Sequence, residues 1–216
     1  MKRINLLVEG QTEEAFVNEL LIPHFSYRNI FFNPIIVSTS KGYKGGVVSY
    51  AKIKPQIEKL CKEDSDAIVS TLFDLYALPN DFPGKMDSNF LLQQGGHAKA
   101  CFLEQRLEQD INEPNFIANI LVHEYEALLF TDIEAFKAWT DDDGVLKPLQ
   151  QIRMQYLPED INDQPTTAPS KRILKVWKQY EKTVHGPLIA CDIGIDSIRQ
   201  SCPHFHNWLT KLENIS

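Results

Sequence analysis

The sequence contains few cysteines, and they lie far apart. The four among its 216 residues are Cys61, Cys101, Cys191 and Cys202. No Cys-x-x-Cys pair occurs, so a disulfide-rich secreted scaffold is excluded and we expect reduced thiols in a cytoplasmic protein. A structural zinc site is not expected either. His204 and His206 follow Cys202 closely, but no second pair with ligand spacing accompanies them.

Long hydrophobic runs are also missing. Apolar runs such as residues 117–122 and 127–130 are far below the roughly 20 residues that a membrane-spanning helix needs. The N-terminus passes from Met1-Lys2-Arg3 into a strand-like run, without the apolar region and cleavage site of a signal peptide. We therefore expect a cytoplasmic protein with no membrane partner.

Positive charge is scarce. The chain has 22 Lys and Arg against 29 Asp and Glu, which gives a formal net charge of -7. This balance excludes a strong general attraction to nucleic acid, which needs clustered basic residues. It does not exclude an enzyme that acts on nucleic acid, because a bound metal ion cancels much of the charge of the acids that hold it.

What the sequence does contain is an alternation of strand and helix patterns. Unbroken apolar runs predict strands buried on both faces at residues 4–8, 67–73 and 116–122, with a shorter one at 34–37. Helical patterns lie between them, after Gly10 and at residues 47–62 and 89–110. Pro55 could kink the second of these helices, and Gly95-Gly96 could interrupt the third. The alternation predicts an α/β fold with a mainly parallel sheet.

Beyond Val122 the strand patterns stop. The remaining helical patterns are residues 124–130, 132–139, 171–182 and 203–212. Prolines punctuate a polar stretch before the third of them. We therefore expect two parts, an α/β core over residues 1–125 and a helical cap over residues 126–216 that packs on the core.

Acidic residues follow each of the three clearest strands. Glu9 comes directly after the first, and Asp74 after the second. Glu124 and Glu126 lie just beyond the third. Because sites in parallel sheets form outside the carboxyl ends of the strands, we expect these side chains to converge on one edge. Any single one of them could equally be structural, since loops are polar and acids favour helix starts.

Glu13 is the most informative acid. It precedes Phe16 by three residues, which places it near the middle of the apolar face of the first helix. A carboxylate directed into the protein is costly unless it is paired, hydrogen-bonded or bound to metal. We therefore predict that Glu9, Glu13 and Asp74 share a divalent cation. Gly10 would allow a tight turn between the two glutamates, and oxygen ligands alone select Mg²⁺ or Mn²⁺.

Several motifs link the chain to known families. The stretch VEGQTEE resembles the glutamate motif of Toprim domains, the metal-binding catalytic modules of topoisomerases, primases and OLD-family nucleases, and its Glu-x-x-x-Glu spacing is most similar to the OLD type. The whole chain further resembles an uncharacterised bacterial family of Toprim-like proteins. The motifs that carry this resemblance are LVEGQTEEAFV, FDLYALPNDFPG, HEYEALLF, INDQPTTAPSKRI, HGPLIA and CPHFHNWL. It implies a Toprim-like fold with Glu9, Glu13 and Asp74 as catalytic metal ligands.

One position departs from the Toprim pattern. The second acid of its Asp-x-Asp motif would stand at Tyr76, and a phenol is a poor Mg²⁺ ligand at neutral pH. Either another acid, from among Asp81, Glu124 and Glu126, completes the site, or two-metal chemistry has been lost. Tyr76 could also be a packing residue with a hydrated hydroxyl.

The best basic element is Lys171-Arg172, next to Ser170 at a predicted helix start. If the helical cap covers the carboxyl ends of the strands, Lys171 could stabilise the charge of phosphoryl transfer and Arg172 could bind substrate. The resemblance supports this role, because OLD-type nucleases use a basic residue beside their metals. Alternatively, Ser170 caps the helix and both cations are solvated. His123 could contact substrate or act as a base, or it could be a structural residue.

These observations lead to three hypotheses. The first is a Mg²⁺- or Mn²⁺-dependent phosphodiesterase or nuclease that acts on DNA or RNA in bacterial defence or DNA processing. The second is a non-catalytic Toprim-like binding or regulatory subunit that works with a partner ATPase, which Tyr76 and the negative net charge favour. In the third, the acids form structural hydrogen bonds and the function lies on the helical cap.

Overall fold

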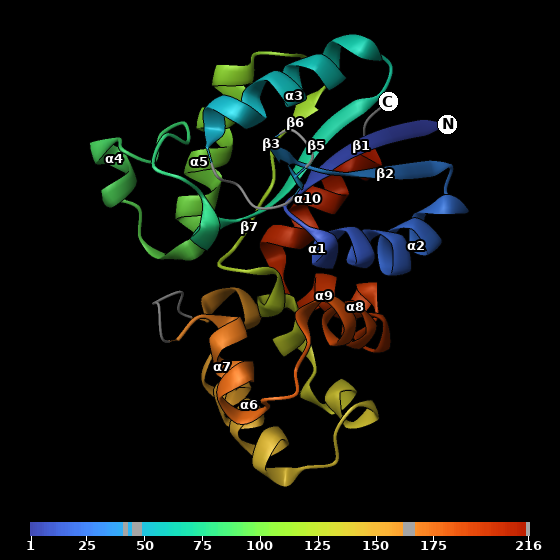
Figure 1. Cartoon of the computed structure of the whole chain (residues 1–216), viewed down its shortest axis with the longest axis vertical. Helices are drawn as coiled ribbons and strands as arrows, with labels where there is room; N and C mark the ends of the chain where they lie inside the picture. Colours follow the sequence, from blue (N-terminus) through green and yellow to red (C-terminus); the bar gives the residue numbers. More distant parts are fainter. Residues whose placement is uncertain (41–42, 45–48, 162–166, 215–216) are drawn as a thin grey trace.

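A sheet of five parallel strands forms the centre of the protein (Figure 1). The computed structural model describes residues 1–40, 43–44, 49–161 and 167–214. The strand order is β2-β1-β5-β6, and β7 also pairs with β5. The strands are β1 (Lys2–Val8), β2 (Ile30–Ile36), β5 (Ile68–Asp74), β6 (Phe116–Ile117) and β7 (Ile120–Leu121). The predicted α/β fold with a parallel sheet is thus confirmed.

The predicted third strand is divided into β6 and β7 because a side chain interrupts the ladder. The Thr71 hydroxyl donates to the Asn119 carbonyl at 2.8 Å and accepts from the Asn119 amide at 3.0 Å. It therefore takes the place of the backbone partner that a continuous strand would have at this point. The predicted strand at residues 34–37 begins earlier than expected, at Ile30.

Helices cover both faces of the sheet, and the strands alternate between two hydrophobic cores. Leu6 and Val8 of β1 lie in one core, and Leu7 lies in the other. The first core is shared with α1 (Gln11–Phe16), the π-helix η1 (Val17–Leu21), α2 (Ile22–Ser26) and α10 (Pro203–Asn214). The second is shared with α3 (Tyr50–Glu63) and α5 (Gly95–Ile111).

The predicted helices between the strands are present with shifted ends. Helix α3 contains Pro55 in its interior, and the residues at which it was expected to begin lie outside the described part of the chain. The expected helix at 89–110 is interrupted at residues 92–94, just before Gly95-Gly96 and not at the glycines themselves: α4 (Ser88–Leu91) ends there, and α5 begins with Gly95 at φ +79°. A short turn of 3₁₀ helix, η2 (Leu75–Ala77), follows β5, and β3 (Ser38–Ser40) pairs antiparallel with β4 (Tyr43–Lys44).

The region after β7 is helical, as predicted, but its elements differ from the expected ones. The expected helices at 124–130 and 132–139 are 3₁₀ helices, and the expected one at 171–182 is broken after Val176. The HGPLIA motif lies inside α8, which contains Pro187 in its interior. The elements are η3 (Tyr125–Thr131), η4 (Ile133–Ala138), α6 (Asp143–Gln155), η5 (Pro158–Asp160), α7 (Pro169–Val176), α8 (Lys182–Ile193), α9 (Ile195–Ser201) and α10.

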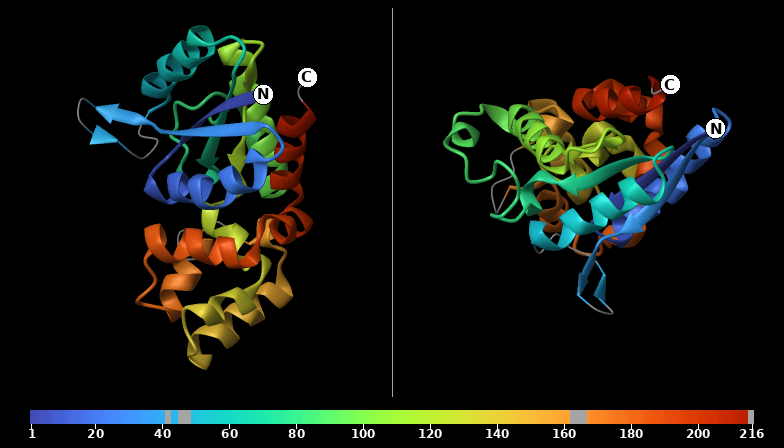
Figure 2. Two further views of the ribbon diagram at one scale, coloured as in Figure 1. Left: turned by 90° about the vertical axis from the view of Figure 1, so that its right-hand side faces the viewer. Right: turned by 90° about the horizontal axis from the view of Figure 1, so that it is seen from above.

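Most of this helical region lies beyond the carboxyl ends of the strands, below the sheet in Figure 1 and in the left view of Figure 2. Helix α10 is different, because it returns to the sheet. The indole nitrogen of Trp208 donates to Ser70 Oγ of β5 at 3.0 Å, and the Lys2 ammonium donates to the Glu213 carbonyl at 2.7 Å. The sheet and the helical region share one continuous core. Among the described residues, no helix is both long and apolar enough to cross a membrane.

Candidate functional site

The predicted acids gather at the carboxyl edge of the sheet, where parallel β1, β5 and β7 end side by side. Strand β1 pairs Val8 with Leu72, so Glu9 lies beside the end of β5, and Asp74 in turn pairs with Leu121 of β7. Helix α1 and the start of η3 add the remaining acids to this edge. We call this group the acid rim. Its members are Glu9, Glu13, Asp74, Glu124 and Glu126.

Three carboxylates of the acid rim accept hydrogen bonds from the backbone of another element. Glu9 Oε1 accepts from the Asp74 amide at 2.7 Å, and Asp74 Oδ1 accepts from the Tyr125 amide at 2.9 Å. Glu124 Oε2 accepts from the Ser170 amide, in the first turn of α7, at 2.9 Å. These bonds link the end of β1 to β5, β5 to η3, and the start of η3 to α7. Each bond engages a single carboxylate oxygen.

Glu13 points into the protein, as its position in the helix predicted, and is 8% exposed. Its neighbour Glu14 is less buried. Gly10 does not play the part expected of it. Its backbone is extended (φ -162°), a conformation open to any residue, and the nearest atom to an added Cβ would be Glu13 Oε2 at an ordinary 3.5 Å. The turn into α1 therefore does not require glycine.

Burial and the charges of neighbouring acids disfavour the charged forms of Glu9, Glu13 and Asp74. Burial, followed by the negative charges of the other four members, raises the pKa of Asp74 well above its usual range. Burial is also the main cause that raises the pKa of Glu9 to about 8, although the hydrogen bond from Asp74 opposes the shift. The pKa of Glu13 is raised mainly by burial as well. Without a cation, Glu9 and Asp74 therefore favour their protonated, neutral forms, because the protein alone does not compensate their charge.

Within the described residues, Lys182 pairs with an acid of the acid rim, and sequence reasoning missed it. Its ammonium lies 2.8 Å from Glu126 Oε1, whose side chain is 1% exposed. Burial alone would lower the pKa of Lys182, but the nearby charge of Glu126 raises it overall. The pKa of Glu126 is raised by burial, and Lys182 limits the shift. No motif signals Lys182, because it begins a helix that the sequence pattern did not separate from the preceding one.

A close approach of two helices brings Lys182 to the acid rim. Gly186, one turn further along α8, faces Tyr125 of η3. A Cβ at this position would lie 3.1 Å from both Tyr125 Cε1 and Tyr180 Oη. This is tighter than ordinary packing, so a larger residue would push α8 away. Tyr125 is fully buried and contacts Phe16 of α1 edge-on, which completes an apolar wall beside the acids.

The predicted basic residues are not among the contacts of the acid rim. The Arg172 guanidinium donates to the Thr167 carbonyl at 2.6 Å and stacks over the Tyr156 ring. Lys171 is exposed. The positive contribution of this segment is instead the Ser170 amide at the start of α7, which reaches Glu124.

Three other predicted residues take structural positions. Asp81 accepts hydrogen bonds from the Ser49 hydroxyl and the Tyr50 amide at the start of α3, so it is not a ligand of the acid rim. His123 is buried, has a left-handed backbone (φ +71°), and its carbonyl accepts from the Tyr76 amide at 3.0 Å. The Tyr76 side chain is 42% exposed.

The donor set of the acid rim fits a hard divalent cation. All of its candidate ligand atoms are carboxylate oxygens, which Mg²⁺ and Mn²⁺ prefer. Glu126 Oε2 is buried without a hydrogen-bond partner among the described residues. A cation at this edge would relieve the repulsion that raises the pKa values of Glu9 and Asp74.

Comparisons with known proteins place the chain in a family. No curated protein matches its sequence. Two solved structures of the C-terminal region of the Xanthomonas campestris pv. campestris OLD protein, phased with iodine and with platinum, are similar over nearly their whole length. The first is 16% identical, with a TM-score of 0.41, and the match covers 98% of this chain and 97% of that one. The second is 17% identical, with a TM-score of 0.41, and covers 97% and 95%.

The sequence also matches a family model. The match runs over residues 8–213, which include the whole acid rim and Lys182. The family is described as a domain of unknown function, DUF4276. Because the match spans nearly the entire chain, this protein belongs to the DUF4276 family.

Proposed function

We propose that this chain is a Toprim-like phosphodiesterase that requires Mg²⁺ or Mn²⁺ and hydrolyses nucleic acid at the acid rim. The observation that carries the proposal is the grouping of four acids around the buried Asp74 at the carboxyl edge of the sheet, where burial and the charges of these acids raise the pKa of Asp74 well above the usual range. Grouping like charges in a buried place is costly, so such a group is a candidate for a functional site. A divalent cation is the partner that would remove this cost.

The residues around the acid rim have distinct roles in this proposal. Glu9, Glu13 and Asp74 would hold the cation, with Glu124 and Glu126 beside them. The metal, when bound, supplies an activated water and neutralises charge on the phosphate. Lys182 binds a phosphate oxygen through its ammonium group, and Glu126 keeps that group charged and oriented.

The backbone of the protein fixes the positions of these side chains. The amide of Asp74 holds Glu9, and the amide of Tyr125 holds Asp74, so two acids from different strands keep a constant spacing. The buried Tyr125 ring limits the access of bulk water from one side. The choice of nucleic acid as substrate, and a role in bacterial defence or DNA processing, follow from the resemblance of VEGQTEE to the Toprim glutamate motif.

A nuclease assay that compares the wild type with a Glu9→Gln variant tests the proposal. Purified protein is incubated with single- and double-stranded DNA and with RNA, in Mg²⁺, in Mn²⁺ and in EDTA. We expect cleavage that depends on the cation and that Glu9→Gln reduces roughly 100-fold or more, because a metal ligand is lost. Glutamine keeps an oxygen that can accept from the Asp74 amide, so the fold is retained.

Glu14→Gln is the matched control. It removes the same charge from the nearby helix α1, away from the buried position of Glu13, and we expect it to leave cleavage unchanged. Cleavage that persists equally in Glu9→Gln would assign the activity to another site or to a contaminant. Absence of cleavage on every substrate and with both cations would contradict the proposal.

Lys182 favours a second candidate function, a non-catalytic binding or regulatory subunit that works with a partner ATPase. In this case the ammonium group permanently takes the place of a metal ion beside Glu126. Calorimetric titration with Mn²⁺ separates the two candidates. The non-catalytic subunit binds no Mn²⁺ as wild type and gains a site in Lys182→Met. The phosphodiesterase binds Mn²⁺ as wild type and loses it in Glu13→Gln.

A further inference from the structure

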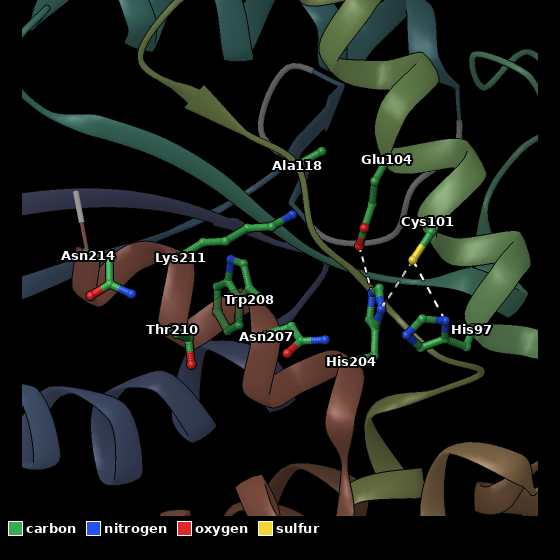
Figure 3. A pocket seen from close by; sticks show the side chains of 10 residues that line it. All are labelled: His97, Cys101, Glu104, Ala118, His204, Asn207, Trp208, Thr210, Lys211 and Asn214. Carbon is green, nitrogen blue, oxygen red and sulfur yellow. Dashed lines mark hydrogen bonds and ion pairs between the residues drawn. The ribbon is translucent and has the colours of Figure 1, made fainter.

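A second group of metal-ligating side chains lies outside the acid rim, and it joins two distant segments of the chain. His97 and Cys101 stand four residues apart on α5, so they project from the same face of that helix. His204 comes from the start of α10. One ligand atom from each of the three lies within 4.8 Å of the other two, and no other trio of His, Cys, Asp or Glu in the described part of the chain does so. Figure 3 shows the three side chains turned toward one another.

The spacing of these atoms is close to that around a tetrahedral metal ion. Cys101 Sγ lies 3.8 Å from His97 Nδ1 and 3.7 Å from His204 Nδ1. Typical zinc bonds to sulfur and nitrogen, at a tetrahedral angle, separate the two ligand atoms by roughly 3.6 Å. Both distances also allow the weak thiol hydrogen bonds that dashed lines mark in Figure 3, so the three groups already face one another. Small side-chain adjustments would therefore suffice to bind an ion.

Glu104 orients one of the three ligands. Its Oε1 lies 2.8 Å from His204 Nε2 and also accepts from the Ile120 amide at 2.8 Å. A hydrogen bond from Nε2 to this carboxylate leaves His204 Nδ1 directed at Cys101. Burial opposes the charged ring, but the hydrogen bonds with Cys101 and Glu104 raise the pKa of His204 to about 10, so a metal ion would displace a proton from Nδ1 when it binds. Metal-binding histidines typically have such a carboxylate on the other ring nitrogen, where it fixes the ring and increases its basicity.

A cavity of about 470 Å³ lies against the three side chains and leaves room for a further ligand. Asn207, Trp208 and Lys211 of α10 line it on the other side (Figure 3). His97 and Cys101 are exposed, whereas His204 is buried. The site is thus open to solvent on one side and anchored on the other. Three protein ligands with an open fourth position are typical of catalytic rather than structural zinc sites.

We propose that His97, Cys101 and His204 bind one Zn²⁺ ion, whose fourth position opens into this cavity. The two nitrogens and one sulfur select Zn²⁺, unlike the oxygen ligands of the acid rim, which select Mg²⁺ or Mn²⁺. The site is independent of the proposed phosphodiesterase activity. It also differs from the sequence cluster around Cys202. Only His204 of that cluster takes part, since Cys202 contacts Thr131 and His206 contacts Arg199.

Metal titrations of the full-length chain test the proposal. Protein stripped with a chelator is titrated with Zn²⁺ by calorimetry and with Co²⁺ by absorption. We expect one Zn²⁺ per chain, and a thiolate-to-Co²⁺ charge-transfer band with the strong visible bands of a tetrahedral ion. His97→Gln and Cys101→Ser should weaken Zn²⁺ binding roughly 100-fold or more, and Glu104→Gln about 10- to 100-fold. Because His97 and Cys101 are exposed, circular dichroism should show that both variants fold.

Two controls separate this site from the rest of the chain. Cys191→Ser removes a partly exposed thiol elsewhere, and Glu9→Gln removes an acid-rim ligand. Both should keep the Zn²⁺ affinity and the Co²⁺ charge-transfer band of wild type. Absence of Zn²⁺ binding, absence of the thiolate band, or equal affinity in His97→Gln would overturn the proposal. Loss of the band in Cys191→Ser would do the same.

Discussion

The acid rim and the trio of His97, Cys101 and His204, which we call the His–Cys site, differ in how closely their side chains approach one another. The trio brings its ligand atoms within 4.8 Å, and no group of acids in the described residues does so. Imidazole and thiol are neutral when protonated appropriately, so they can approach without a cation. Carboxylates repel, and here three of them are held by backbone amides of other elements instead.

Because of this difference, the distance between candidate ligand atoms is not enough to compare the two sites as metal sites. A metal-free site of soft, neutral ligands can be nearly preformed, whereas a site of hard, charged ligands has to relax inward when its ion arrives. The features that distinguish the acid rim are the raised pKa values of Glu9 and Asp74 and the ion pair between Lys182 and Glu126. We therefore expect the two sites to respond differently to pH, to metal ions and to substitution.

The largest expected effect is a loss of stability of the metal-free protein as the pH rises. Burial raises the pKa of Glu9 to about 8 in the folded state, whereas an unfolded glutamate titrates near its ordinary value. Between those two values the folded state holds a proton that the unfolded state has released. The free energy of unfolding should therefore fall with rising pH, by about 1.4 kcal/mol per unit for one such group, and level off above pH 8.

Urea unfolding followed by tryptophan fluorescence in EDTA, from pH 5 to pH 8, measures this slope. The difference between wild type and Glu9→Gln isolates the contribution of the Glu9 carboxyl from those of the histidines. Saturating Mn²⁺ should stabilise the protein more at pH 8 than at pH 5, because the ion competes with protons for the acids. A wild-type stability that rises with pH relative to Glu9→Gln would contradict the raised pKa.

A smaller effect is expected at Gly96, which packs against the segment that leads into the acid rim. Gly96 precedes His97, and a Cβ on it would lie 2.6 Å from Val122 Cγ1 and 2.7 Å from the His123 ring. Gly96→Ala should push the start of α5 away from the end of β7 and destabilise the protein by about 1–3 kcal/mol. It should also weaken Zn²⁺ and Mn²⁺ binding together.

Chemical denaturation and the two metal titrations measure these effects. Gly10→Ala is the matched control, since its Cβ would meet only Glu13 Oε2 at 3.5 Å, and we expect a change within about 1 kcal/mol. If Gly96→Ala weakened the binding of one metal ion and left the affinity for the other unchanged, the packing around Gly96 would not connect the two sites.

The fold and the acid rim could be predicted because their signals are local. Each strand is a short apolar run, and each acid follows directly on a strand or one turn into a helix, so parallel pairing brings them together. The break between β6 and β7 could not be predicted, since it depends on Thr71 of a neighbouring strand. The 3₁₀ helices after β7 carry the same apolar composition as α-helices, and only tertiary packing separates them.

Contacts between distant segments account for the rest of what the sequence did not reveal. Cys101 and His204 are 103 residues apart, and neither stands in a ligand motif with the other. Lys182 and Glu126 are likewise joined only by the packing of α8 on η3, which Gly186 permits. The sequence motif around Lys171 favoured that residue, but in the structure it is Lys182 that contacts Glu126 of the acid rim.

The smallest expected effect concerns Tyr76, where the Toprim pattern has a second acid. In an extended strand, residues 74 and 76 would face the same side, but the turn at Leu75–Ala77 rotates Tyr76 outward, and its side chain is 42% exposed. Tyr76→Asp should therefore change stability by less than about 0.5 kcal/mol and Mn²⁺ affinity by no more than about threefold. Tyr76→Asn controls for loss of the ring. A tenfold gain in Mn²⁺ affinity in Tyr76→Asp, but not in Tyr76→Asn, would contradict this expectation. It would mean that an acid at position 76 can reach the metal despite the turn, and that the acid rim of the wild type lacks one ligand because this residue is a tyrosine.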